Sequence, residues 1–206
     1  PIYLPLINND PAQPVEAYFE HVDWVLDALA QRDMVAGLLP TWGDKVHPKW
    51  GEGPIIFTED NARTYGEYVG RRYADRENVV WILGGDRPAV DAEEGGKDFR
   101  PIWRAMAAGI KSGGSDQLMG YHPRGFDRTS PTLHHEDWLD FNAIQSSHSK
   151  PDQPSWTFIE EDYALEPVKP TIEMESCYED IPVDFKPDNR RFNAYDVRKQ
   201  AYRPVF

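Results

Sequence analysis

The feature that most restricts the fold is the continuous apolar run at residues 78–83, which lies between a charged turn and the pair Gly84-Gly85. A strand that is apolar at every position is buried on both faces, as in a parallel sheet covered by helices. Shorter apolar runs predict further strands at 34–39, 117–121, 141–145 and 170–174. Helical spacing of apolar residues predicts helices at 14–32, 59–75, 98–111, 155–165 and 189–199. This alternation predicts an α/β protein.

Two architectures fit this alternation: a doubly wound open sheet and a (β/α)8 TIM barrel. No glycine-rich phosphate loop follows any predicted strand, so nucleotide binding has no support. Polar and aromatic residues instead follow the carboxyl ends of successive strands: Trp42 and Asp44, Asp86 and Arg87, His122, Ser146 and His148, and Glu175 and Tyr178. A barrel builds its active site at this end, from several strands. The pattern therefore favours the barrel.

Charge and composition exclude several classes of partner. With 35 acidic and 22 basic residues, the chain has a formal net charge of −13. Phosphate backbones and anionic membrane surfaces both require clustered cations, so we expect neither nucleic acid nor membrane as a partner. The apolar runs are far shorter than the roughly 18 residues that span a bilayer. The single cysteine, Cys177, excludes an internal disulfide framework. The sequence indicates no cofactor and leaves the oligomeric state open.

Two carboxylates stand out as a candidate catalytic pair. Asp86 directly follows Gly84-Gly85, where the backbone can adopt unusual angles and a ligand can approach closely. Glu175 follows the predicted strand at 170–174. A pair of carboxylates in one pocket is the usual equipment for cleaving a glycosidic bond. The alternative is that each one caps a helix or lies in a solvated loop.

Residues at other strand ends are candidates for binding a substrate. They would stack on a sugar ring or orient its hydroxyl groups, and they are Trp42, His122, Gln145, His148 and Tyr178. Tyr121 is a further candidate for stacking, whereas we expect Trp50 to pack as an ordinary aromatic residue. Glu173 shares the strand face of Glu175 and is expected to be its buried partner. Cys177 is expected to be a packed thiol.

Six histidines raise the alternative of a metal site. His122 and His148 end strands, and His134-His135 lie next to each other in a polar segment. No His-Glu-x-x-His motif or comparable ligand spacing is present. We therefore expect no metal, and expect the strand-end histidines to bind hydroxyl groups or hold a carboxylate.

Several segments together resemble the apiosidase-like glycoside hydrolases, in the same order and over nearly the whole chain. They are residues 18–23 (Tyr-Phe-Glu-His-Val-Asp), 39–43 (Leu-Pro-Thr-Trp-Gly), 78–86 (Asn-Val-Val-Trp-Ile-Leu-Gly-Gly-Asp), 121–123 (Tyr-His-Pro), 145–148 (Gln-Ser-Ser-His) and 169–179 (Lys-Pro-Thr-Ile-Glu-Met-Glu-Ser-Cys-Tyr-Glu). The run that ends at Asp86 is the most specific of these. Where the family usually has Gly-Glu-Pro, this chain has Met174-Glu175-Ser176.

The resemblance implies a (β/α)8 barrel of the large retaining clan. It implies that Asp86, after the fourth strand, is the acid/base, and that Glu175, after the seventh, is the nucleophile. The family's characterised activity is removal of apiose from pectic side chains. The resemblance also implies that residues 1–206 are one catalytic domain seen in part, with strands 3 to 7 but without the first two strands and the last, since a whole barrel has about 250 residues.

The sequence therefore predicts a retaining glycoside hydrolase that removes a terminal sugar, apiose or a related one, from a plant or microbial polysaccharide. A secreted or periplasmic location is the favoured expectation. Two alternatives stay open. One is a carbohydrate-binding or scaffolding module without catalysis, and the other is a metal-dependent hydrolase of the same fold.

Overall fold

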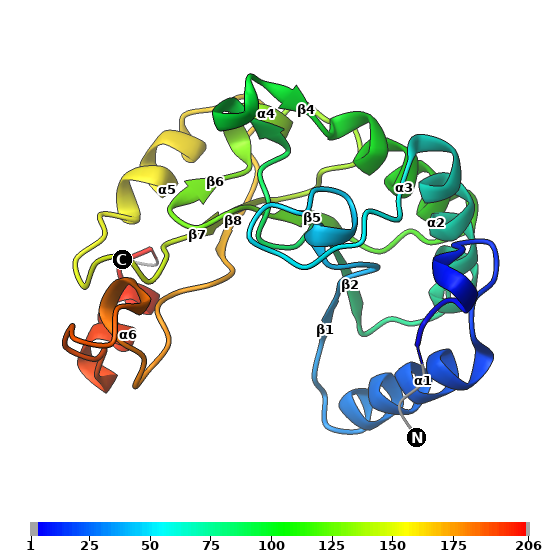
Figure 1. Cartoon of the computed structure of the whole chain (residues 1–206), viewed down its shortest axis with the longest axis horizontal. Coiled ribbons are helices and arrows are strands. Elements are labelled where there is room, and N and C mark those ends of the chain that lie inside the picture. Colours follow the sequence, from blue (N-terminus) through cyan, green and yellow to red (C-terminus); the bar gives the residue numbers. More distant parts are fainter. Residues whose placement is uncertain (1–3, 205–206) are drawn as a thin grey trace. The chain divides into compact units, whose positions relative to one another are not determined.

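Helices and short strands alternate along the chain, as Figure 1 shows, and the α/β class expected from the sequence is confirmed. The structure is a computed structural model that describes residues 4–204. The chain divides into two units, the first ending at Met119 and the second beginning at Gly120. Among the described residues, no helix has the length and apolar character needed to cross a bilayer.

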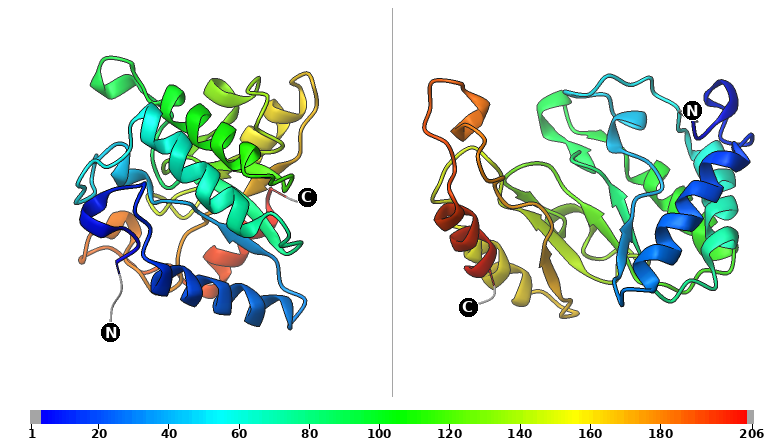
Figure 2. Two further views of the ribbon diagram at one scale, coloured as in Figure 1. Left: turned by 90° about the vertical axis from the view of Figure 1, so that its right-hand side faces the viewer. Right: turned by 90° about the horizontal axis from the view of Figure 1, so that it is seen from below.

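The first unit contains helices α1 (Glu16–Ala30), α2 (Glu59–Tyr73) and α3 (Arg100–Ser112). Thr58 caps α2, in a capping box with Asn61. Helices α2 and α3 run side by side (Figure 2), with their backbones in close approach. A Cβ on Gly109 would lie 2.2 Å from the Arg63 carbonyl oxygen, so only glycine fits at this crossing. Arg72 ties α2 to α1 through ion pairs with Glu16 and Asp23.

The sheet of the first unit is built on the apolar run near residue 80. Strand β2 (Val79–Gly84) pairs in parallel with β1 (Ala36–Leu38). The Trp81 N–H donates to the Leu118 carbonyl oxygen, directly before β5 (Met119–His122). Trp81 and Leu83 are fully buried. The predicted parallel, doubly covered strand is therefore confirmed, and its carboxyl end leads into Gly85 and Asp86.

The second unit repeats the alternation on a smaller scale. Strand β7 (Asn142–Gln145) pairs in parallel with β8 (Thr171–Glu173), and β6 (Asp127–Arg128) pairs with β7 in the antiparallel direction. The helices are α4 (Ser130–Leu133), α5 (Trp156–Tyr163) and α6 (Ala194–Tyr202). The carboxyl ends of β7 and β8 carry the polar residues that the sequence analysis singled out.

The structure differs from the predicted elements at the last helix and in several short elements, which include β6 and α4. The last helix was expected at 189–199 but begins at Ala194, because the Asn193 side chain caps it by accepting the N–H groups of Tyr195 and Asp196. The short pair β3 (Val90–Asp91) and β4 (Lys97–Asp98) was not predicted. Strands of two residues show no alternation of polar and apolar side chains, so the sequence carries no signal for them.

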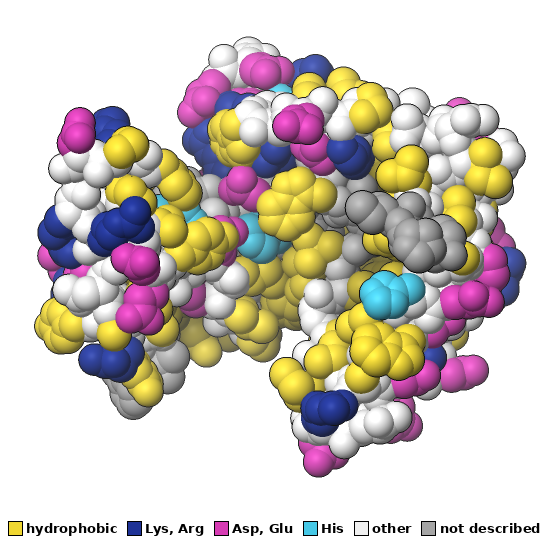
Figure 3. All heavy atoms as spheres, turned by 60° about the horizontal axis from the view of Figure 1, so that its bottom comes forward, with side chains coloured by type: hydrophobic (Ala, Val, Ile, Leu, Met, Phe, Trp, Pro, Cys, Tyr) yellow, Lys and Arg dark blue, Asp and Glu magenta, His cyan; other side chains and the backbone are white. Residues whose placement is uncertain are grey.

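Side chains on the outer surface include several large apolar ones (Figure 3). On α1, Trp24 is exposed and stacks against the exposed ring of His21, with 5.8 Å between the ring centres. His21 therefore lies on the surface of its helix.

Candidate active site

Asp86 lies on a tight turn at the end of β2. Gly84, Gly85 and Asp86 all have positive φ angles, of 86°, 92° and 57°. A Cβ on Gly85 would lie 2.7 Å from the Gly43 nitrogen, so the turn packs directly against the segment after β1. Glycine is needed here both for the backbone angle and for the close approach. The two glycines set the position from which Asp86 projects.

Two donors contact the same oxygen of Asp86. The indole Nε1 of Trp50 donates to Oδ2 at 2.9 Å, and Nη1 of Arg87 lies 3.3 Å from that oxygen. The Asp86 side chain is 24% exposed, whereas the Arg87 side chain is buried. Arg87 also donates to the backbone carbonyl oxygens of Asp86 and His47. These contacts fix Oδ2, and the Asp86 side chain remains partly accessible.

The segment that carries Trp50 is anchored by a buried ionic group. His47 Nε2 lies 2.8 Å and Lys49 Nζ 2.7 Å from the same Asp91 oxygen, and Lys49 also pairs with Glu93. Burial raises the pKa of Asp91, but the hydrogen bonds from Lys49 and His47 outweigh it and hold that pKa well below its usual range. Asp91 is therefore ionised, and it fixes the residues on both sides of Pro48.

Among the described residues, potential metal ligands come close enough together to hold an ion around His47 and Asp91. Ligand atoms of His47, Asp91 and Glu94 lie within 4.8 Å of one another. The Lys49 ammonium lies on the Asp91 carboxylate, so a cation already balances this charge. None of the histidines in the metal alternative, His122, His134, His135 or His148, belongs to this group.

Glu175, just after β8, is the centre of a second cluster. His122 Nε2 lies 3.1 Å from its Oε2, and His148 Nε2 lies 3.2 Å from its Oε1. The Tyr178 hydroxyl also donates to Oε1. The rings of His148 and Tyr178 lie 4.1 Å apart. Three of the predicted binding residues thus converge on the predicted nucleophile.

These donors keep Glu175 ionised. Burial raises its pKa, but the hydrogen bonds and charge of His122 and His148 outweigh burial and lower the pKa to about 2. The second nitrogen of His122, Nδ1, lies 3.0 Å from the Pro123 carbonyl oxygen. His122 therefore lies between two acceptors, the Glu175 carboxylate and the Pro123 carbonyl oxygen.

Glu173 lies two residues before Glu175, and its pKa is shifted in the opposite direction. Its Oε1 accepts the backbone N–H groups of Ser146 and Glu175. Burial raises its pKa, and the nearby charge of Glu175 adds to the increase. The prediction of a buried partner beneath Glu175 agrees with these contacts, and Glu173 holds the backbone of Glu175 in place.

The remaining predicted residues are distributed as follows. Trp42 is about half exposed in the first unit, and its ring lies against Gly85. Gln145 is buried at the end of β7. Cys177 is a buried thiol, and burial raises its pKa to about 11, as a packed and unreactive thiol requires. Tyr121 is fully buried, so the suggestion that it stacks on a sugar was wrong.

Sequence reasoning missed two residues near Asp86. Trp50 was expected to pack as an ordinary aromatic, but it is 58% exposed and bonds to Asp86. The second residue, His47, is buried and stacks on Phe99 with 4.3 Å between ring centres. The position of Trp50 between Lys49 and Gly51 could have indicated its exposure. A tryptophan in a polar, glycine-rich loop has few apolar neighbours against which it can be buried.

Comparison with known proteins supplies independent information. The family model described as "Apiosidase-like, catalytic domain" matches residues 2–206. A crystal structure of a glycoside hydrolase family 5 protein from Bacteroides vulgatus ATCC 8482 is similar, with a TM-score of 0.80 and 32% identity over 91% of this chain and 41% of that one. A second structure, titled only as a glycoside hydrolase, has a TM-score of 0.80 and 29% identity over 91% of this chain and 43% of that one. The chain thus spans less than half the length of both. Among curated proteins, none matches.

Proposed function

The chain belongs to the apiosidase-like catalytic-domain family, and from this membership we propose that it is a retaining glycoside hydrolase with Glu175 as its nucleophile. The observation that carries the proposal is the cluster of His122, His148 and Tyr178 around the Glu175 carboxylate. A nucleophilic carboxylate has to be ionised and correctly oriented before the substrate arrives. The histidines provide the charge that keeps it ionised, and the three donors fix its plane.

In the first step of the proposed reaction, an oxygen of Glu175 attacks the anomeric carbon while the bond to the leaving oxygen breaks. Asp86 transfers a proton to that oxygen, and a glycosyl ester on Glu175 results. In the second step, Asp86 takes a proton from water, and the water oxygen displaces Glu175 from the anomeric carbon. Both residues then return to their starting states, and the sugar leaves with its configuration retained.

The contacts of Asp86 support an assignment of its two oxygens in this reaction. Trp50 Nε1 and Arg87 Nη1 both approach Oδ2. Both groups only donate hydrogen bonds, so a proton on Oδ2 would point at another donor. We therefore assign Oδ2 as the oxygen that accepts these bonds throughout the reaction. Trp50 then acts as a positioning residue that sets the rotation of the carboxyl group.

Further parts of the proposal concern the fold and the substrate. We propose that the chain forms strands 3 to 7 of a (β/α)8 barrel as part of one catalytic domain, with Trp42 and Gln145 also contacting the sugar. The substrate would be a terminal sugar, apiose or a related one, on a plant or microbial polysaccharide.

Because such polymers are extracellular, we propose a secreted or periplasmic location. In a crystal structure of the full-length protein, the carboxyl groups of Asp86 and Glu175 should lie about 5 to 5.5 Å apart.

The decisive experiment uses the full-length protein and a panel of aryl glycosides that includes the apioside. We expect release of the phenol by the wild type, and a loss of at least about 1000-fold with Glu175→Gln. A 2-fluoro glycoside of the active sugar should add one glycosyl mass to the peptide that contains Glu175. Hydrolysis that survives in Glu175→Gln, or labelling of a different peptide, would rule out this nucleophile.

A further inference from the structure

The loop between β8 and α6 (orange in Figure 2) contacts one of the two histidines on Glu175. Its two arms are joined by backbone hydrogen bonds, among them the one from the Val183 N–H to the Arg190 carbonyl oxygen, at 3.0 Å. Between these arms, the Asp184 N–H donates to the carbonyl oxygen of His148 at 2.8 Å. The loop is therefore folded on itself and tied to the backbone of His148.

Two residues at the tip of this loop have a backbone conformation that favours glycine. Asp184 and Phe185 have positive φ angles of 59° and 55°. A bulky residue keeps such an angle only where the surrounding contacts impose it, and positions of this kind cluster at functional sites. Phe185 is also 63% exposed, so burial of its ring in the core does not explain the conformation.

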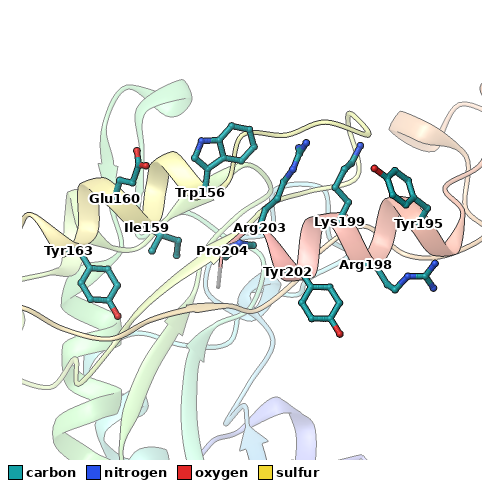
Figure 4. A pocket seen from close by; sticks show the side chains of 10 residues that line it. All are labelled: Trp156, Ile159, Glu160, Tyr163, Tyr195, Arg198, Lys199, Tyr202, Arg203 and Pro204. Atoms are coloured by element: carbon teal, nitrogen blue, oxygen red, sulfur yellow. The ribbon is translucent and has the colours of Figure 1, made fainter. Parts of the chain in front are cut away.

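The aromatic contact of Phe185 is with the imidazole of His148. The two ring centres lie 5.2 Å apart and the ring planes meet at 72°, which is the edge-to-face arrangement that aromatic rings favour. The Tyr178 ring lies 4.1 Å from the same imidazole, and His148 is 5% exposed. The open groove on α5 and α6 (Figure 4) is lined by neither Phe185 nor His148. The exposed ring of Phe185 therefore belongs to the surroundings of Glu175 and not to that groove.

The two histidines on Glu175 are held in different ways. Both place Nε2 on the carboxylate, but Nδ1 of His122 also lies 3.0 Å from the Pro123 carbonyl oxygen. Nδ1 of His148 is buried, and no residue within 4–204 forms a hydrogen bond with it. Bonds at both nitrogens fix the orientation of an imidazole, whereas a bond at one nitrogen leaves its rotation to the packing around it.

We propose that Phe185 is a positioning residue that holds the His148 imidazole against the Glu175 carboxylate. The edge of the phenyl ring limits the rotation of the imidazole, and the Asp184 N–H fixes the backbone from which the imidazole extends. This packing takes the place of the second hydrogen bond that His122 has. The consequence for hydrolysis rests on the proposed function, whereas the orientation of His148 is a property of the free protein.

The test compares Phe185→Gly with Phe126→Gly in the full-length protein. Glycine suits a positive φ angle, so the change removes the ring without straining the loop. Phe126 is the matched control in the same unit, since it is 40% exposed, has a φ of 51°, and lies 5.1 Å from the ring of Phe158 instead of a histidine. Phe185→Asn, which also tolerates a positive φ, is a second variant without the ring, and Phe185→Tyr keeps the ring.

The first measurement is nitrogen-15 NMR of the histidine rings, with the signals assigned from His122→Gln and His148→Gln. In the wild type, Phe126→Gly and Phe185→Tyr, we expect both Nε2–H signals to be protected from exchange with water. In Phe185→Gly and Phe185→Asn, exchange at His148 should be at least about 10-fold faster, because the imidazole leaves the carboxylate more often. Exchange at His122 should be unchanged, because two bonds hold that ring.

The second measurement is hydrolysis of an aryl glycoside. Phe185→Gly should lower kcat about 10-fold with little change in KM, which is less than the roughly 100-fold that a fully misplaced group costs, because His122 and Tyr178 still hold Glu175. Phe185→Tyr should restore kcat.

Three results would overturn the proposal: unchanged exchange at His148 in Phe185→Gly, the same change in Phe126→Gly, or faster exchange with an unchanged kcat. Equal loss of protection at His122 and His148 would also count against it, because it indicates general loosening of the fold. A wild type that hydrolyses no glycoside, with His148 responding as expected, would contradict only the hydrolase proposal. An active wild type in which His148 does not respond would contradict only this one.

Discussion

The two histidines on Glu175 allow a quantitative prediction. Their hydrogen bonds and charge overcome burial and lower the pKa of Glu175 from an ordinary 4.5 to about 2. If His122 and His148 are both replaced by alanine, burial remains, and the Tyr178 hydroxyl is the one of the three named donors still opposing it. The pKa of Glu175 should then rise above 4.5, because burial disfavours the charged form. At about 1.36 kcal/mol for each pH unit, the lost stabilisation of the carboxylate is about 3 kcal/mol.

The assay is a carbon-13 NMR titration of the glutamate carboxyl groups from pH 3.5 to 8, with the Glu175 signal assigned from Glu175→Gln. In the wild type, this signal should stay at the position of an ionised carboxylate over the whole range. In the double variant, it should titrate with a midpoint above 4.5. His21→Ala is the matched control, because His21 is an exposed histidine on α1. A wild-type midpoint near 4.5, or a double variant that stays ionised down to pH 3.5, would refute the reasoning.

The same depressed pKa predicts how stability depends on pH. A carboxyl group whose pKa is lower in the folded state stabilises the fold at any pH above its unfolded pKa, and this stabilisation is lost as the pH falls toward the folded value. For Glu175 the window lies between about 4.5 and about 2. The free energy of unfolding of the wild type should therefore fall through this window more steeply than that of Glu175→Gln. Parallel curves for the two proteins would contradict the lowered pKa.

Four further predictions concern the proposed site and its support. Asp86→Ala should largely spare formation of the glycosyl ester from activated aryl glycosides and slow the hydrolysis of unactivated glycosides. Azide should restore the second step, in which the glycosyl ester is broken down. Equal losses on all substrates without rescue by azide would contradict the acid/base role. Trp50→Phe keeps a ring but removes the donor to Asp86. Because a bond to a charged group contributes about 1.5 to 3 kcal/mol, kcat on unactivated substrates should fall roughly 10- to 100-fold with little change in KM. An unchanged kcat would remove Trp50 from the site. Activity should survive dialysis against a chelator, and a loss that zinc alone restores would favour the metal alternative. Gly109→Ala should lower the melting temperature, although alanine normally favours a helix, because its Cβ would lie 2.2 Å from the Arg63 carbonyl oxygen; a stabilised variant would contradict the close packing of α2 and α3.

Much of the fold could be predicted from the sequence because long apolar runs and helical periodicity are local signals. The strand near residue 80 and the helix capped by Thr58 are both found close to their expected positions. The cluster at Glu175 was also accessible, since parallel strands bring their carboxyl ends to one edge. His122 ends β5 and His148 follows β7 by three residues, and both contact the carboxylate that follows β8.

The surroundings of Asp86 were harder to predict, because they depend on contacts between loops. Trp50 lies 36 residues before Asp86, and Lys49 lies 42 residues before Asp91. The conformation of the segment that carries Trp50 depends on ion pairs with a two-residue strand that has no sequence signal of its own. Tyr121 fails for a related reason. A residue at the end of a strand can face either the ligand or the core, and its position in the sequence does not decide between the two.

Glu173, the last residue of β8, and Glu175, two residues beyond it, show how two neighbouring carboxyl groups can present one charge. If both were ionised, their repulsion would raise the pKa of Glu175 and oppose the effect of the histidines. Burial instead raises the pKa of Glu173 and favours its neutral form, while His122 and His148 act on Glu175 alone. The backbone N–H groups of Ser146 and Glu175 both approach Oε1 of Glu173, so a proton on that carboxyl group belongs on Oε2. Glu173 can thus fix the backbone of its neighbour without competing for the positive charge that keeps Glu175 ionised.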